Sequence, residues 1–374
     1  METVGGINDP DYAEHIIRDG VADFVAMARS FIADPDWAEK ARLGKADDIR
    51  PCIRCLHCMD FCEPLDSSGS LSCCSVNARR IYRRPLEHVI RSKEQKQVII
   101  VGGGPAGMNA AIEIADQGHQ VTLLEKEKKL GGRLEFADFL SFKSGVRNYR
   151  EYLIRQVKKR KNITIKTECK VTRDLLASYH ADAIVIASGA DKFVPNIPGS
   201  SLPIAIHSSD IFRHTDKIGD RVVVIGGGDV GCELTIQLQT MGKTVHLIEA
   251  ADRLMKFSKG FWEDKVFTEF FLTHEYKPDL RSFDDLKNVT SVHIHLSSRC
   301  DSITERGVRF TDKDGQSHEI EADTVILSTG LCNQPDDLDC LDDLAETVLY
   351  IGDRRQPANI ENATRDGYTA SLRI

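Results

Sequence analysis

Long hydrophobic runs, a surplus of basic residues and a leader-like N-terminus are all missing from this 374-residue sequence. No stretch approaches ~18 uninterrupted apolar residues, so we expect no membrane span. The first residues lack the basic and apolar regions of a signal peptide, which predicts a cytoplasmic location. The net charge of -8 offers no footprint for nucleic acid. A hydrophobic content of 41% is enough for two or three buried cores.

A redox-active cysteine pair is missing from most of the chain. Nothing resembling C-x-x-C occurs after Gly107, which disfavours thiol–disulfide chemistry. Five scattered cysteines have no cysteine nearby, and we expect them to be small buried hydrophobes. They are Cys169, Cys232, Cys300, Cys332 and Cys340. The other six crowd into residues 52–74, which indicates a metal site rather than disulfides.

A glycine-rich turn, GGGPAG, lies between the apolar run VIIV and an alanine-rich helix. In a dinucleotide-binding turn the first glycine permits the tight bend, the second lets the backbone approach a pyrophosphate, and the third lets helix and strand pack closely. The helix N-terminus supplies N–H groups to the phosphates, and an acidic residue after the next strand binds the ribose. The expected residues are Gly102, Gly104, Pro105, Ala106, Gly107 and Glu125.

The same pattern recurs in RVVVIGGGDVG, followed by the run TVHLIE. Every position maps onto the first copy with one constant offset, giving Gly226, Gly228, Gly231 and Glu249. A single glycine turn can simply form a tight corner between strand and helix. Two copies, each with an acidic residue eighteen positions after the last glycine, indicate a repeated dinucleotide-binding unit and hence two adenine nucleotides.

The first copy is the better flavin site. GGR follows it, the run AIVIASG ends at Gly189, and VLYIGD near the C-terminus resembles the strand and aspartate that contact the flavin ribityl chain in such flavoproteins. These segments add Gly132, Arg133, Gly189, Gly352 and Asp353 to the expected FAD site. The second copy is then the nicotinamide site, where Glu249 would repel a 2′-phosphate and favours NADH, although Arg253 keeps NADPH open.

The stretch PCIRCLHCMDFC has C-x2-C-x2-C spacing, which suits one face of a [4Fe-4S] cluster with a fourth ligand farther along. A structural zinc site is usually closed by a second C-x2-C or two histidines, whereas only His57 is nearby. We therefore expect a cluster. Its expected ligands are Cys52, Cys55, Cys58 and Cys74, with Cys62 as the alternative to Cys58 and Cys73 as the alternative to Cys74.

The first fifty residues read as strand, helix, strand, helix. The expected elements are Val4–Ile7, Pro10–Asp19, Ala22–Ala28 and Pro35–Gly44. Two βα units leave open sheet edges, so this segment resembles the end of a larger parallel α/β structure.

With these residues in hand, the chain resembles the C-terminal part of the NADH:flavin oxidoreductases related to old yellow enzyme that carry an iron-sulfur cluster. That family includes 2,4-dienoyl-CoA reductase, 2-enoate reductase and trimethylamine dehydrogenase. It places an FMN-binding TIM barrel first, then a [4Fe-4S] segment, then an FAD domain with an inserted nicotinamide domain. CSVN, residues 74–77, resembles its final-ligand motif and favours Cys74. Gly6, with the backbone of Ala28 and Arg29, would hold the FMN phosphate.

The expected fold is therefore α/β, with nested FAD- and NAD(P)-binding Rossmann-like domains of the pyridine nucleotide-disulfide reductase type. The expected domains are 1–50, the last two βα units of a TIM barrel; 51–95, the iron-sulfur segment and linker; 96–215, the first part of the FAD domain; 216–333, the NAD(P) domain; and 334–374, the FAD return segment.

The resemblance implies an order of electron transfer. NADH reduces FAD, FAD passes single electrons to the cluster, and FMN in the barrel reduces an activated C=C bond. Because most of the barrel is missing from this sequence, we expect the electron-input part of an enoate or dienoyl-CoA reductase-like enzyme. FMN would bind only if a barrel-bearing polypeptide or a second copy supplied the rest. Alternatives are a glutamate synthase small-subunit-like electron carrier and a catalytically silent nucleotide-binding fragment.

Overall fold

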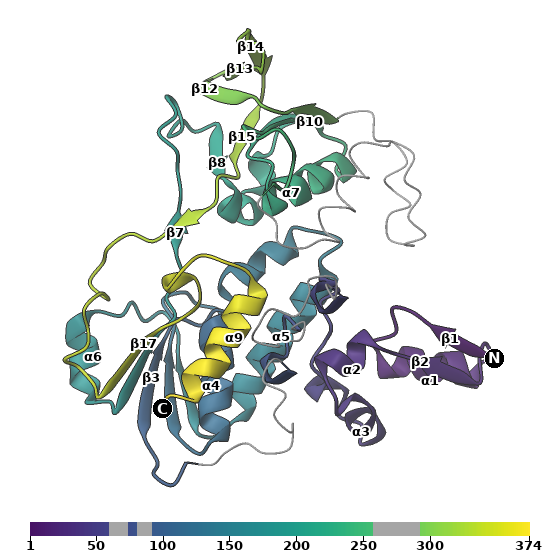
Figure 1. Cartoon of the computed structure of the whole chain (residues 1–374), viewed down its shortest axis with the longest axis vertical. Helices are drawn as coiled ribbons and strands as arrows, with labels where there is room; N and C mark the ends of the chain where they lie inside the picture. The colour runs from purple at the N-terminus through teal and green to yellow at the C-terminus, as the bar shows by residue number, and fades with distance from the viewer. Residues whose placement is uncertain (60–73, 81–91, 257–291) are drawn as a thin grey trace, which may run out of the picture. The chain divides into compact units, whose positions relative to one another are not determined.

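The computed structural model describes residues 1–59, 74–80, 92–256 and 292–374 (Figure 1). It forms two compact units. Unit 1 contains Met1–Glu135, Gly145–Asp191 and Cys332–Ile374, and unit 2 contains Phe136–Ser144 and Lys192–Leu331. No helix among the described residues combines the length and apolarity needed to cross a bilayer.

Unit 1 is built on a parallel sheet with the strand order β17-β6-β3-β4-β5. The strands are β3 (Gln97–Val101), β4 (Gln120–Leu124), β5 (Ile163–Lys166), β6 (Ala183–Ile186) and β17 (Thr347–Tyr350). The helices are α4 (Pro105–Asp116), α5 (Ser144–Lys159), α6 (Arg173–Tyr179) and α9 (Ile360–Ser371). The apolar runs that predicted strands are these buried parallel strands.

Alternate residues of these strands feed two different cores. Val98 and Ile100 point toward α4, α5 and α9, which cover one face of the sheet (Figure 1). Ile99 and Val101 point to the other face, where Leu176 of α6 is buried. Because both faces are covered, continuous apolar strands rather than alternating ones are required.

Unit 2 repeats this design with the strand order β11-β10-β9-β15-β8, all parallel. Its elements are β8 (Ala205–His207), β9 (Arg221–Ile225), α7 (Asp229–Thr240), β10 (Thr244–Ile248), β11 (Val292–His295) and β15 (Thr324–Leu327). A separate antiparallel sheet covers one face, formed by β12 (Arg299–Thr304), β13 (Gly307–Thr311) and β14 (Ser317–Glu321). The prediction of two Rossmann-like α/β domains is confirmed.

Two segments show how the units are divided along the chain. The expected NAD(P) domain begins at residue 216, whereas edge strand β8 of its sheet lies before that residue. The expected division of the chain into five parts remains a prediction. Residues 136–144 lie in unit 2, where Leu140 is fully buried and Lys143 pairs with Glu233 of α7. Short strands β7 (Asp191–Lys192) and β16 (Leu331–Cys332) pair where the chain passes between the units.

The N-terminal segment, in unit 1, is a small βα structure with a core of its own. Its elements are β1 (Glu2–Val4), α1 (Pro10–Arg18), β2 (Phe24–Ala26), α2 (Arg29–Ala33) and α3 (Trp37–Arg42). The expected strand Val4–Ile7 is wrong, because Gly5 and Gly6 adopt φ of +113° and +65° and end the strand early. Helix α2 was not predicted, because it is only five residues long.

Strands β1 and β2 form a parallel sheet of only two strands. Large exposed apolar side chains are concentrated in this segment, among them Val4 at 73% and Phe24 at 70% exposed. Exposed sheet edges and exposed apolar side chains of this kind are typical of an interaction surface.

Three histidines cluster on one face of the unit 2 sheet. His246 of β10 stacks on His293 and His295 of β11, with ring centroids 4.5 and 5.4 Å away. His246 Nδ1 lies 3.1 Å from His295 Nε2. Burial, with the two neighbouring histidines, lowers the pKa of His246 to about 4. His246 is therefore neutral at physiological pH.

Replacing His246 tests this arrangement. Its pKa falls from 6.5 to about 4 on folding, so unfolding takes up a proton and stability is lost as the pH falls through that window. Lowering the pH from neutral to 5 should lower the thermal unfolding temperature of the wild type. We expect this decrease to be a few degrees smaller in His246→Gln, which lacks the titrating group. Circular dichroism measures this, with His15→Gln on exposed α1 as control. An acid response identical to that of the wild type would contradict the prediction.

Candidate functional site

The first glycine turn joins β3 to α4 through two backbone contacts that admit no side chain. A Cβ built at Gly107 would lie 1.9 Å from the carbonyl oxygen of Gly102, and one built at Gly102 would lie 2.3 Å from that of Ala187. Any other residue would push the helix away from the sheet. These two positions therefore hold the N-terminus of α4 against the end of β3.

Gly104 is open, in contrast. A Cβ built there would meet nothing within 4 Å, and Gly104 precedes α4 as an N-cap with no side-chain hydrogen bond. Pro105 occupies the first position of the helix, where its missing N–H costs nothing. The first turn of α4 thus offers free N–H groups and partial positive charge to an anion such as a pyrophosphate.

Glu125 lies directly after β4 and is buried. Its carboxylate accepts hydrogen bonds from the N–H of Gly103 at 2.6 Å and of Glu127 at 2.8 Å. Each oxygen retains a further acceptor site, so a ribose hydroxyl can also be bound. Glu125 therefore supports the glycine turn as well as being placed for a nucleotide.

Three segments far apart in sequence converge on this turn. A Cβ built at Gly132 would lie 3.0 Å from Gly104 Cα, and one built at Gly352 would lie 2.8 Å from Ala106 Cβ. Arg133 donates to the Ala190 carbonyl, beside Gly189, and its Nε lies 3.9 Å from Asp353 Oδ2. The structure thus brings together all the segments predicted for the flavin.

Two further features suit a polar cofactor here. The Ser188 hydroxyl oxygen is buried and has no hydrogen-bond partner among the described residues. Burial raises the pKa of Asp353, although a hydrogen bond from the Ala358 N–H and the charge of Arg133 oppose this. An unpaired buried hydroxyl is costly unless a ligand completes it. The residues present fit a flavin dinucleotide.

The second turn repeats the first almost atom for atom. A Cβ built at Gly231 would lie 1.9 Å from the Gly226 carbonyl oxygen, and Gly228 is again open and uncapped at the start of α7. Glu249 accepts from the N–H of Gly227 at 2.5 Å and of Ala251 at 2.7 Å. Helix α7 begins at Asp229, three residues before the expected start near Cys232.

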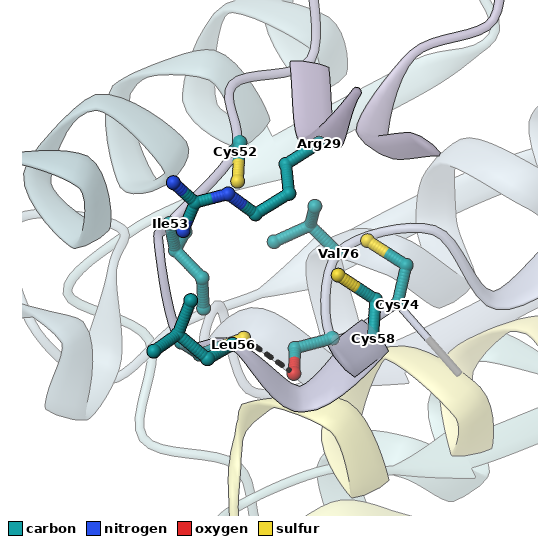
Figure 2. Close-up of a pocket in the computed structure, with 9 residues that line it drawn as sticks. Arg29, Cys52, Ile53, Leu56, Cys58, Cys74 and Val76 are labelled. Atoms are coloured by element: carbon teal, nitrogen blue, oxygen red, sulfur yellow. Dashed lines mark hydrogen bonds between the residues drawn. The ribbon is translucent and has the colours of Figure 1, made fainter. Parts of the chain in front are cut away.

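The expected cluster cysteines lie around one pocket. Cys58 and Cys74 are buried, Cys52 and Cys55 are half-buried, and the pocket is partly open to solvent (Figure 2). Its lining residues are Arg29, Cys52, Ile53, Cys55, Leu56, Cys58, Cys74, Ser75 and Val76. Cys62 and Cys73 lie outside the described residues.

The loop around Cys55 is bent to present its thiol. Arg54 and Leu56 adopt φ of 59° and 58°, a left-handed conformation that is unusual for such residues and is often found at functional sites. The Arg54 N–H lies 3.4 Å from Cys52 Sγ, and Ser75 Oγ lies 3.2 Å from Cys55 Sγ. Such hydrogen bonds to sulfur tune iron-sulfur centres.

The four thiols are not arranged for a single ion or for disulfides. All four are present as thiols rather than in disulfides. No three His, Cys, Asp or Glu side chains among the described residues meet at a point that one metal ion could occupy. Burial, reinforced by the neighbouring cysteines, raises the pKa of Cys74 to about 12, so a bound cation would have to stabilise the thiolates. Four cysteine thiols that line one pocket are the type of ligand set that a four-iron cluster takes.

Contacts with three helices hold the cysteine segments in place. His57 Nε2 lies 3.0 Å from Glu361 Oε2, at the start of α9. Arg79 pairs with Glu113 of α4 at 2.6 Å, and Asn77 donates to the Ile32 carbonyl of α2 at 3.0 Å. Sequence reasoning missed Glu361 and Ser188, because nothing in their local spacing marks them.

Gly6 and Arg29, two of the residues expected at an FMN phosphate, make other contacts in this structure. The Gly6 carbonyl accepts from Arg54 Nη2 at 3.4 Å. Ala28 is the exposed residue before α2, and the side chain of Arg29 lines the cysteine pocket. Their assignment to FMN remains a prediction.

Comparison with known proteins places the two parts of the chain in families. Residues 96–347 match the family model of pyridine nucleotide-disulphide oxidoreductases, and residues 1–48 match the NADH:flavin oxidoreductase / NADH oxidase family. A bilirubin reductase of Mediterraneibacter gnavus is 29% identical over 99% of this chain and 54% of its own length. An NADH oxidase of Thermoanaerobacter brockii is 30% identical over 100% and 55%.

Solved structures of similar fold support the same family relationship. A 2-naphthoyl-CoA reductase complex has a TM-score of 0.85 at 26% identity, covering 100% of this chain and 54% of that one. Histamine dehydrogenase from Rhizobium sp. 4-9 has a TM-score of 0.81 at 24% identity, covering 100% and 55%, and shows the shared fold. The chain spans about half the length of these relatives. It belongs to the pyridine nucleotide-disulphide oxidoreductase family and matches the C-terminal half of iron-sulfur flavoproteins related to old yellow enzyme, as the resemblance predicted.

Proposed function

We propose that this chain is the electron-input part of an enoate or dienoyl-CoA reductase-like enzyme, using NAD(P)H, FAD and a [4Fe-4S] cluster. The observation that carries the proposal is the convergence of Cys52, Cys55, Cys58 and Cys74 on one pocket, in the same unit as the first glycine turn. When bound, FAD accepts a hydride from the nicotinamide and releases single electrons to an acceptor such as a cluster.

In this proposal the first turn holds FAD. The uncapped N-terminus of α4 binds the pyrophosphate, and Glu125 binds the adenosine ribose. Arg133 and Asp353, together with Gly352, face the remainder of the flavin. The Ser188 hydroxyl would gain the partner it lacks among the described residues.

The second turn holds the nicotinamide nucleotide. Its helix α7 is uncapped in the same way, so it binds the pyrophosphate with backbone N–H groups. The Glu249 carboxylate is held at the ribose position by two backbone N–H groups. A fixed negative charge there repels a 2′-phosphate, which favours NADH over NADPH.

The acceptor beyond the cluster would be FMN in a barrel of which residues 1–48 form part. The match of residues 1–48 to the NADH:flavin oxidoreductase family and the exposed apolar surface around β1 and β2 support this. A relative named cinnamate reductase, from Clostridium sporogenes, is 27% identical over 100% of this chain and 53% of its own length. An activated C=C bond is accordingly the substrate class we propose.

Anaerobic purification with iron, sulfide and flavin analysis tests the whole proposal. We expect iron, acid-labile sulfide and FAD in the chain, and we expect NADH to bleach the flavin absorption band and support reduction of an artificial acceptor. Bound nucleotide without a flavin band would instead indicate a silent nucleotide-binding fragment, and would refute the electron-input function.

Cys74→Ser tests the fourth ligand. Because Cys74 contributes a buried thiol to the pocket, we expect the variant to lose most of its iron and sulfide while retaining FAD. Cys340→Ser is the matched control, because Cys340 is exposed and remote from the pocket lining. Full iron content in Cys74→Ser would show that another residue is the ligand.

Glu249→Ala tests nucleotide preference. Loss of the fixed carboxylate removes the repulsion of a 2′-phosphate, so we expect the ratio of kcat/KM for NADH over NADPH to fall about tenfold. Stopped-flow reduction of the flavin by each nucleotide measures the ratio. A wild-type chain that uses both nucleotides equally well would contradict the assignment.

A further inference from the structure

Arg29 lines the cysteine pocket, although its backbone lies where the family resemblance expects an FMN phosphate. It is the first residue of α2, and its side chain extends across the pocket beside Cys52 (Figure 2). Asn77 holds the segment after Cys74 against α2 by donating to Ile32. The same short helix is therefore fixed to the cysteine segment and places a guanidinium in the pocket beside Cys52 (Figure 2).

No carboxylate among the described residues pairs with Arg29. No ion pair joins it to an acidic side chain anywhere in the described ranges 1–59, 74–80, 92–256 and 292–374. Arg29 is also the one residue with a permanent charge among the nine described residues that line the pocket. Among the described residues that line the pocket, the cysteines are therefore the groups that could offer this guanidinium a negative charge.

The surroundings strengthen this interaction. Ile53, Leu56 and Val76 supply apolar surface to the pocket, and charges act over a longer range there than in water.

We propose that Arg29 is the counter-charge of the iron-sulfur cluster and raises its reduction potential. The inference rests on the proposed function, since it takes the pocket to hold a cluster. When one electron enters from the reduced flavin, the net charge of the cluster and its four thiolates becomes more negative by one. The Arg29 guanidinium stabilises the reduced form more than the oxidised form, so it makes the cluster a better acceptor. Ser75 and the Arg54 N–H, which bond the sulfurs as neutral dipoles, supplement this effect.

Potentiometric titration of the anaerobic full chain, followed by electron paramagnetic resonance, tests the proposal. For Arg29→Gln we expect a more negative midpoint potential, with the ratio of oxidised to reduced cluster rising about tenfold at a fixed potential, or about 59 mV for a one-electron couple. Arg29→Lys keeps the charge and should titrate close to the wild type. Arg42→Gln removes an equal charge from exposed α3 and should have no effect.

The outcomes separate this proposal from the function on which it rests. Arg29→Gln with full iron and an unchanged midpoint overturns the role of Arg29 and leaves the electron-input function standing. A wild-type chain without iron and sulfide overturns both. If Arg29→Gln loses the cluster while Arg29→Lys keeps it, the charge requirement is supported. If both variants lose it equally, shape rather than charge is responsible and the proposal fails.

Discussion

The close contact between a helix glycine and the carbonyl of the turn glycine is the constraint on which the rest of the structure depends. At Gly107 and again at Gly231 a side chain would lie 1.9 Å from a backbone oxygen. The absence of a side chain lets each helix start directly against its strand. The first helical turn is then left uncapped and open beside Gly104 and Gly228, so its N–H groups are available to phosphates.

The order of the strands in the unit 1 sheet brings the other segments to the first glycine turn. Strand β3 lies between β4 and β6, and β17 lies beyond β6, so the carboxyl ends of four parallel strands meet at one edge. That edge gathers Glu125, Gly189 and Gly352 around a single turn, although more than two hundred residues separate the first from the last. Helix α9 then packs closely on α4, because Gly367 leaves room beside the Ala106 carbonyl oxygen.

The cysteine pocket depends on contacts with both sides of unit 1. Arg79 and His57 tie its segments to α4 and α9, whereas Asn77 and Arg29 connect them to α2 of the N-terminal βα segment. That segment has its own small core but exposes a broad apolar surface around β1 and β2. The pocket therefore lies where a flavin-binding sheet and a barrel-like fragment meet within one compact unit.

The sequence by itself determined the two Rossmann-like sheets, since the repeated glycine spacing and the buried apolar runs are local features of the chain. It also predicted four cysteines that the structure places around one pocket, and their role as cluster ligands remains a prediction. The ends of the elements in residues 1–50 were less well predicted, because short strands carry little periodic signal. Only the tertiary structure decided that residues 136–144 belong to unit 2, that Glu361 holds His57, and that Arg29 lines the cysteine pocket. These are contacts between segments distant in sequence, and packing rather than local pattern determines them.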